Sequence, residues 1–334
     1  MRERTVFALT VLTLVLLAAG YWVGSSVDLM PFQASTRSVL VDGLFRLLLG
    51  VATVIFLIVE GALVYAVLRF RRRAGDESDA APVHGHTGLE VVWTLIPAVL
   101  VTGISVYSFM VLSDIERPGE DALVVEVTAR QFSWEFYYPD YELTAAEVHL
   151  PVNRPVRFLI SSGDVIHSFW VPAFRAKRDA TPGQVAELVI EPQTIGRYPV
   201  RCAELCGFGH AGMITEVVVE TDPDFRSWIA GQRAIPSDPI EAGRFLFARY
   251  GCGACHTLTD TGATGVVGPS LDGIGVRAAT RVAGLDAEGY IRESILRPSA
   301  LVVAGFQDGL MPPNLGERLS QQELDILVKY LLGQ

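Results

Sequence analysis

The sequence predicts a multidomain membrane protein with a membrane-spanning N-terminal part, an all-β middle domain and an all-α C-terminal domain. Three observations predict this organisation. Long apolar runs are confined to the first third of the chain, an apolar alternation with a period of two begins near residue 122, and helical periodicity surrounds a Cys-x-x-Cys-His motif near the C-terminus. The change of period along the chain therefore separates three kinds of domain.

Composition excludes several classes of protein. Of the 334 residues 50% are hydrophobic and only 19% are charged, and the mean hydropathy is +0.34. Soluble domains carry roughly 25% charged residues, so the chain is neither disordered nor wholly soluble. The net charge of −10 disfavours nucleic acid as a partner and favours a basic protein.

Three apolar runs, residues 6–23, 44–70 and 89–112, are candidates for membrane helices. About 20 helical residues cross a bilayer core, so the second and third runs predict a transmembrane hairpin within residues 25–115. The first 24 residues have two interpretations. Arg2 and Arg4 before an apolar stretch that ends in small residues fit either a signal peptide or a first membrane helix.

The arginines at positions 69 and 71–73 predict the orientation of the hairpin. Clustered arginines at a helix end stay cytoplasmic, so residues 74–88 form the cytoplasmic loop. The chain from about residue 115 onward then lies on the outer, periplasmic side of a bacterial cytoplasmic membrane. Glu60 and Glu90 lie in or at these helices, where an ionisable group costs about 2.5–3.5 kcal/mol and usually faces protein or water.

Short runs rich in Val, Ile and aromatic residues predict strands within residues 116–230. They lie at residues 123–128, 133–137, 156–160, 186–190 and 214–220, and Pro and Gly separate them. Short strands with such turn signals predict a β-sandwich or barrel.

Soft metal ligands gather near the end of this domain. Cys202, Cys206, His210 and Met213 follow one another closely, and His167 lies upstream. Thiolate, imidazole and thioether on a β-sandwich are typical of copper sites. A mononuclear site needs one thiolate, so the second cysteine favours two bridged metals. The alternatives are a disulfide, which leaves His210 and Met213 unexplained, and zinc, for which methionine is a poor ligand.

With these residues, positions 25–230 resemble subunit II of the haem–copper cytochrome c oxidases. The resemblance implies a helix hairpin followed by a cupredoxin-like domain with the binuclear copper A centre. It also implies that the side chain of Glu204 reaches a magnesium or manganese ion shared with subunit I. The implied copper ligands are His167, Cys202, Cys206, His210, Met213 and the backbone carbonyl of Glu204.

Two further residues are interpreted through this resemblance, and a third departs from it. Residues 89–97 are similar to the family's second helix, which places Glu90 at the entrance of a proton path into subunit I. Phe132 stands after Gln131 where the family usually has a tryptophan that accepts electrons from soluble cytochrome c. Trp134 matches the second tryptophan of that stretch. Phe132 and Trp134 are electron-transfer candidates, with core aromatic residues as the alternative.

A linker at residues 231–238 leads to the C-terminal domain, residues 239–334. Cys252, Cys255 and His256 form the c-type haem motif, in which the cysteines make thioethers and the histidine binds iron. A redox dithiol and half a zinc site are the alternatives. Met311, the only methionine of this region, is the candidate sixth ligand. The domain resembles a class I cytochrome c, with helices near 239–250, 287–296 and 320–332 and the Pro269 carbonyl supporting His256.

The resemblance implies an oxidoreductase and proton translocase subunit. Electrons pass from a periplasmic donor, a cytochrome c or cytochrome bc complex, through haem c and copper A to subunit I, which reduces oxygen and pumps protons. Subunits I and III and membrane lipid are the expected neighbours. The alternatives are the electron-input subunit of a related nitric oxide reductase and a membrane-anchored periplasmic copper and haem carrier.

Overall fold

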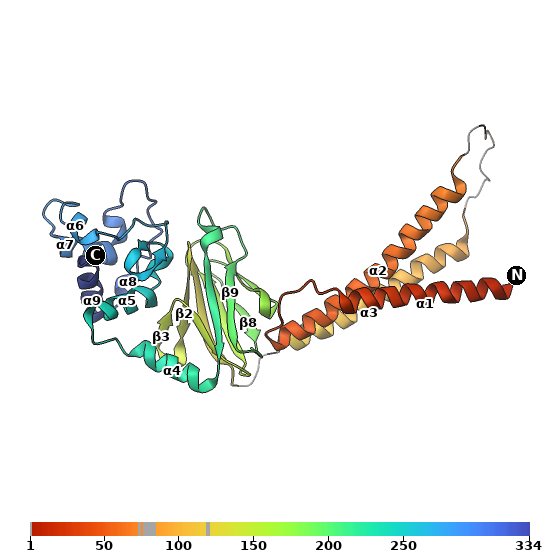
Figure 1. The fold of residues 1–334 in the computed structure, drawn as a ribbon, viewed down its shortest axis with the longest axis horizontal. Helices are drawn as coiled ribbons and strands as arrows, with labels where there is room; N and C mark the ends of the chain where they lie inside the picture. The colour runs from red at the N-terminus through yellow and green to blue at the C-terminus, as the bar shows by residue number, and fades with distance from the viewer. Residues whose placement is uncertain (1, 73–74, 76–84, 118–120) are drawn as a thin grey trace. The chain divides into compact units, whose positions relative to one another are not determined.

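The computed structural model describes residues 2–72, 75, 85–117 and 121–334, which form two compact units (Figure 1). The first unit comprises Met1–Phe32 and Ser38–Arg117, and the second comprises Gln33–Arg37 and Pro118–Gln334. Arg73 and most of the predicted cytoplasmic loop lie outside the described residues. The predicted sequence of membrane helices, β-sandwich and helical domain is confirmed.

The first unit consists of three long helices, α1 (Arg2–Ser26), α2 (Thr36–Phe70) and α3 (Thr87–Ile115). Each is long and apolar enough to cross a membrane. Helix α2 begins at Thr36, before the predicted residue 44, because the hydropathy pattern marks only the apolar part of a helix. The polar turns at its start are helical as well.

Glycines allow α1 to approach α2 closely. A Cβ on Gly20 would lie 2.8 Å from the carbonyl oxygen of Gly50, and one on Gly24 would lie 2.6 Å from the carbonyl oxygen of Arg46. Both distances are too short for a side chain, so these positions need glycine. Small residues at such a contact let helix backbones pack closely within a membrane.

The middle domain is a sandwich of two five-stranded sheets in the orders β3-β2-β1-β5-β8 and β4-β10-β9-β6-β7 (Figure 1). The predicted strands correspond to β1, β2, β5, β8 and β10, and alternate residues of β1 and β2 are buried as a period of two requires. The bounds are β1 Leu123–Arg130, β2 Ser133–Tyr138, β3 Leu143–Ala145, β4 Val148–Pro151, β5 Val156–Ser162, β6 His167–Val171, β7 Ala176–Ala180, β8 Ala186–Ile190, β9 Gly196–Cys202 and β10 Ile214–Glu220.

Helix α4 (Asp222–Arg233) follows the last strand and extends into the predicted linker. The side chain of Thr221 caps its first turn by accepting a hydrogen bond from the backbone of Asp224. Phe225 is fully buried in the sandwich core, and Trp228 packs against this core. The end of the sandwich is therefore covered by a helix, and the chain leaves it only after Arg233.

The C-terminal domain is helical, with a small hairpin of β11 (Thr257–Leu258) and β12 (Ala263–Thr264). Its helices are α5 Pro239–Arg249, α6 Ile274–Ala278, α7 Ala287–Leu296, α8 Leu315–Arg318 and α9 Gln321–Leu332. Helix α9 begins as predicted, because Ser320 and Glu323 form a capping box. Its apolar face, with Leu324, Leu327 and Val328, is buried in the domain core.

Candidate metal centre and haem pocket

Strand pairing brings the upstream histidine to the cysteine loop. His167 begins β6 and Cys202 ends β9, and these strands pair with Phe169 opposite Cys202. The loop from Ala203 to Met213 then returns the chain to β10, which pairs with β9. Two neighbouring strands and one loop therefore supply all the predicted ligands.

The predicted copper ligands converge. The two sulfur atoms of Cys202 and Cys206 are 3.8 Å apart. The Nδ1 atom of His167 lies 3.8 Å from the Cys202 sulfur, and that of His210 lies 3.6 Å from the Cys206 sulfur. The Met213 sulfur is 3.9 Å from the Cys206 sulfur. These side chains form one cluster.

The cluster fits the chemistry of a soft metal. First-row metals bind thiolate at about 2.3 Å, so a single ion can contact two sulfur atoms that are 3.8 Å apart. Both cysteines are free and buried, and His167 is fully buried. Both histidines present the same nitrogen, Nδ1, to a sulfur atom. The donor set of thiolates, imidazoles and a thioether is the one that copper prefers.

Electrostatics prepare one thiol for metal binding. Burial raises the pKa of Cys202, but hydrogen bonds with His167, Ser168 and Glu204 outweigh burial and lower this pKa to about 6. Burial and the neighbouring charge of Cys202 raise the pKa of Cys206 to about 12. Because a metal binds the thiolate form, metal binding must displace the proton of Cys206.

Asp164 orients His167 by contacting the ring nitrogen that faces away from Cys202. Its Oδ1 atom lies 2.8 Å from Nε2 of His167, which leaves Nδ1 facing Cys202. Burial lowers the pKa of His167, but the hydrogen bond with Asp164 dominates together with Cys202, and the pKa rises to about 9. A carboxylate behind a ligand histidine fixes its orientation and raises its basicity. Asp164 was not predicted from the sequence, although its Asp-x-x-His spacing relative to His167 was a usable signal.

The backbone carbonyl of Glu204 lies 3.2 Å from the Cys202 sulfur, at the edge of the cluster. Its side chain is exposed. The carbonyl is therefore in place for the predicted copper contact, and the carboxylate is accessible to a partner.

The two aromatic candidates are buried beside the cluster. Phe132 packs edge-on against Phe208 at 5.0 Å and closely against the loop glycines Gly207 and Gly209. The ring of Trp134 lies edge-on to Phe169 at 5.5 Å and to His167 at 6.3 Å. Both belong to the sandwich core, as the structural alternative predicted, and both also lie near the ligands.

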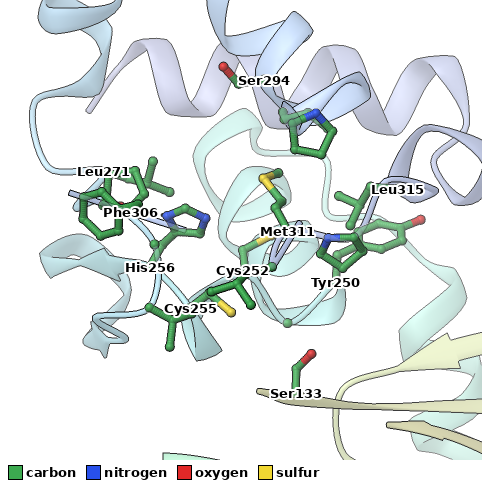
Figure 2. A pocket seen from close by; sticks show the side chains of 18 of the residues that line it. Ser133, Tyr250, Cys252, Cys255, His256, Leu271, Ser294, Phe306, Met311 and Leu315 are labelled. Atoms are coloured by element: carbon green, nitrogen blue, oxygen red, sulfur yellow. Dashed lines mark hydrogen bonds between the residues drawn. The ribbon is translucent and has the colours of Figure 1, made fainter. Parts of the chain in front are cut away.

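The haem motif and Met311 line one cavity. Figure 2 shows Cys252, Cys255, His256 and Met311 around it. The rest of its wall is mostly apolar and includes Phe247, Leu271, Ile291, Ile295, Phe306 and Leu315. A cavity with an apolar wall and two thiols beside an imidazole fits a covalently attached haem.

His256 is held in position from one side. Its Nδ1 atom lies 2.7 Å from the carbonyl oxygen of Pro269, which is the contact predicted from the sequence. A Cβ on Gly268 would lie 2.4 Å from the His256 ring, so only glycine allows the chain to pass this close. The hydrogen bond leaves Nε2 available as an iron ligand.

Burial favours the neutral forms of the side chains in the haem motif. It lowers the pKa of His256, although the Pro269 carbonyl opposes this effect. It raises the pKa of Cys252 to about 12, and the neighbouring Cys255 adds to the rise. A neutral imidazole is the form that binds iron.

Glu90 lies in the first turn of α3, and its side chain accepts a hydrogen bond from the backbone of His86 at 3.2 Å. This contact satisfies a free N–H group at the helix start. Glu60 lies in the second half of α2, and its side chain is exposed among the described residues.

Three family models match the chain. Residues 22–111 match "Cytochrome C oxidase subunit II, transmembrane domain", residues 143–221 match the periplasmic domain of the same subunit, and residues 240–334 match "Cytochrome c". These matches imply copper A in the middle domain and haem in the last domain.

Curated relatives span most of the chain. "Cytochrome c oxidase subunit 2" of Synechocystis sp. is 34% identical over 273 residues, which cover 68% of this chain and 82% of the relative. The protein of the same name from Thermostichus vulcanus is 36% identical, with 71% and 87% covered. The solved periplasmic domain of subunit II of cytochrome oxidase from Bradyrhizobium japonicum is 31% identical, with a TM-score of 0.33 and 34% and 96% covered. The chain belongs to the cytochrome c oxidase subunit 2 family, with a cytochrome c domain fused at its C-terminus.

Proposed function

We propose that this chain is the electron-transfer subunit of a respiratory cytochrome c oxidase. Its Cys/His/Met cluster and its haem motif would hold copper A and haem c, which would supply one-electron carriers between a periplasmic donor and subunit I, the expected site of oxygen reduction and proton pumping. One observation carries the proposal. Two thiols, two imidazoles and a thioether converge within one compact unit that also contains a Cys-x-x-Cys-His cavity.

We propose that Cys202, Cys206, His167 and His210 would hold two copper ions. Met213 and the carbonyl of Glu204 are the remaining ligands. Bound copper would supply a one-electron carrier at this position. The protein holds the donor atoms on two paired strands and one loop, and it buries His167, both cysteines and Met213. Asp164 keeps His167 in the orientation that binding needs.

In the second domain, Cys252 and Cys255 would form the thioether bonds, and His256 and Met311 would be the iron ligands. Covalently bound haem would supply a second one-electron carrier. Pro269 fixes the imidazole, and most of the cavity wall is apolar. A methionine ligand favours a high haem potential.

Contacts with other subunits complete the proposal. The exposed carboxylate of Glu204 is the candidate ligand of a magnesium or manganese ion shared with subunit I. Glu90 is the candidate entrance of a proton path. We propose that α1, α2 and α3 all stay in a bacterial cytoplasmic membrane beside subunits I and III. The close packing of Gly20 and Gly24 on α2 supports a retained α1.

Purification of the complex from native membranes tests this function. We expect the chain to copurify with a large polytopic subunit and to support oxygen consumption with a reduced donor. A matched pair of variants, Cys206→Ser and His149→Gln, separates metal loss from general damage, because His149 is buried in the same sandwich but lies on β4 outside the cluster. Turnover of nitric oxide without oxygen consumption would favour the nitric oxide reductase instead. Purification without a polytopic subunit would favour a free carrier.

A further inference from the structure

The loop between β12 and α6 carries the carbonyl group that contacts the candidate haem ligand. This loop, residues 265–273, is here called the proximal loop. Within it, the carbonyl oxygen of Pro269 lies 2.7 Å from Nδ1 of His256. The strength of this hydrogen bond depends on how firmly the proximal loop is held against the haem motif.

Backbone hydrogen bonds join the proximal loop to the haem motif on both sides of Pro269. The N–H of Gly268 donates to the carbonyl of Cys255 at 2.7 Å, and the N–H of Leu271 donates to the carbonyl of Thr257 at 2.9 Å. Proline itself has no N–H group to donate. These two bonds therefore flank the Pro269 carbonyl without holding it directly.

Arg277 of α6 fixes the part of the loop that follows Pro269. Its guanidinium donates hydrogen bonds to the carbonyl oxygen of Ser270, at 2.7 Å, and to that of Asp272. A Cβ on Gly273 would lie 3.2 Å from a nitrogen of this guanidinium, so the side chain packs tightly along the loop. The planar fork of arginine suits two acceptors at once. The carbonyl directly after that of Pro269 is thus held by a charged donor.

The carboxylate of Asp272 ties the same part of the loop to the segment after β11. It accepts hydrogen bonds from the backbone N–H of Thr259 at 2.8 Å and from the Thr259 hydroxyl at 3.0 Å. The hydroxyl of Ser270 donates to it at 3.4 Å. The hydrogen bonds from Thr259 lower the pKa of Asp272. Arg277 and Asp272 therefore hold the loop together, one through the backbone and one through a side chain.

Arg277 lies outside the haem cavity. Its side chain is exposed, and it is absent from the described residues that line the cavity, whereas Arg281 is among them. Its guanidinium is occupied by the two loop carbonyls. Apart from its charge, Arg277 therefore acts on the cavity only through the proximal loop.

We propose that Arg277 is a positioning residue that sets the haem potential by holding the Pro269 carbonyl against His256. The inference rests on the proposed function and names a device that tunes it. A hydrogen bond from Nδ1 to an acceptor raises the basicity of a ligand imidazole, and a more basic ligand stabilises oxidised iron. The hydrogen bond to Pro269 thus lowers the potential of the one-electron couple. A looser proximal loop raises it.

The charge of Arg277 has the opposite effect, and this difference in sign makes the proposal testable. Removal of a nearby positive charge disfavours an added electron and lowers the potential. Arg277→Lys keeps the charge but replaces the planar fork by a single ammonium group, which cannot hold two carbonyls in the same geometry. Arg277→Met removes both the charge and the fork. A rise in the lysine variant therefore reports positioning alone.

The test measures the haem c potential of the complete purified oxidase by optical titration at the c-type absorption band. Electron paramagnetic resonance of the oxidised haem gives its g values as a second readout. We expect Arg277→Lys to increase the equilibrium constant for reduction severalfold, where tenfold corresponds to about 59 mV for one electron, and to shift the g values. We expect a smaller rise in Arg277→Met, because the lost charge opposes it.

Thr259→Val is a second variant, because it loosens the loop without any change of charge by removing the hydroxyl that binds Asp272. We expect a rise in the same direction as in Arg277→Lys. Arg292→Lys is the matched control, because Arg292 lies on α7 and pairs with Glu288 and Asp325. It should keep the wild-type potential and g values.

A potential at or below the wild-type value in Arg277→Lys would overturn the inference and leave the proposed function intact. If Arg277→Lys does not assemble, a wild-type potential in Thr259→Val would overturn it in the same way. Absence of covalently bound haem from the wild-type oxidase would instead overturn the proposed function.

Discussion

The two candidate redox sites are built in opposite ways. The copper cluster takes its side chains from two paired strands and one loop, and its donor atoms lie within 4 Å of a neighbouring donor without any metal. The haem cavity is instead a hollow lined by residues from Phe247 to Leu331 and by β2. The core of the sandwich packs fully without the metal site, whereas the core of the helical domain needs the haem to fill its cavity.

This contrast predicts the largest effect in the helical domain. Replacing both Cys252 and Cys255 by Ala removes covalent attachment and leaves an apolar cavity that the domain must collapse around or expose to water. We expect residues 240–334 to lose cooperative unfolding and to become sensitive to protease, while the sandwich remains resistant. Limited proteolysis with mass spectrometry measures both regions in one sample. A protected helical domain in this variant would show that its core is complete without haem.

The corresponding change in the sandwich should be much milder. Cys206→Ser removes one bridging thiolate, so we expect loss of copper but retention of a cooperative thermal transition. The expected cost is roughly 1–3 kcal/mol, the usual range for a buried polar group without its partners. Calorimetry and metal analysis of the same preparation test this. Unfolding of the sandwich would contradict its description as a preformed site.

The sequence predicted the site residues better than it predicted the strands, helix and contacts around them. Most of the ligands lie in short sequence motifs that can be recognised directly. The period-two alternation located five of the strands. Strand β7 is polar and β6 is almost wholly buried, so neither alternates in the expected way. Helix α4 was missed because it follows a strand without a break. The ion pair between Glu135 and Arg318 joins positions far apart in the chain, which no local pattern encodes.

A smaller change sharpens the account of the haem pocket. Gly268→Ala places a methyl group 2.4 Å from the His256 ring, so the ring must move away from Pro269. Such overpacking costs about 1–3 kcal/mol. We expect a shifted haem potential and an altered absorption spectrum. Gly231→Ala serves as the control, because a Cβ there meets nothing within 4 Å. An unchanged potential in Gly268→Ala would mean that Pro269 does not tune the ligand.

The smallest effect concerns acid stability. Asp260 accepts hydrogen bonds from Arg244 and Tyr330, which lower its pKa from 3.8 to about 2. A depressed carboxyl pKa stabilises the fold above the unfolded value and loses this contribution as pH falls toward about 2. Asp260→Asn should therefore flatten the pH dependence of melting in this range, whereas the exposed Glu317→Gln should not. Identical acid melting curves for wild type and Asp260→Asn would exclude this contribution.

The central claim is that one chain carries both redox centres. Metal and haem analysis of the full-length chain, purified within its complex and combined with copper paramagnetic resonance, tests it most directly once the metals of the other subunits are subtracted. We predict two coppers that share one unpaired electron and one covalently bound haem per chain. A single copper, zinc in its place, or haem that organic solvent extracts would contradict it.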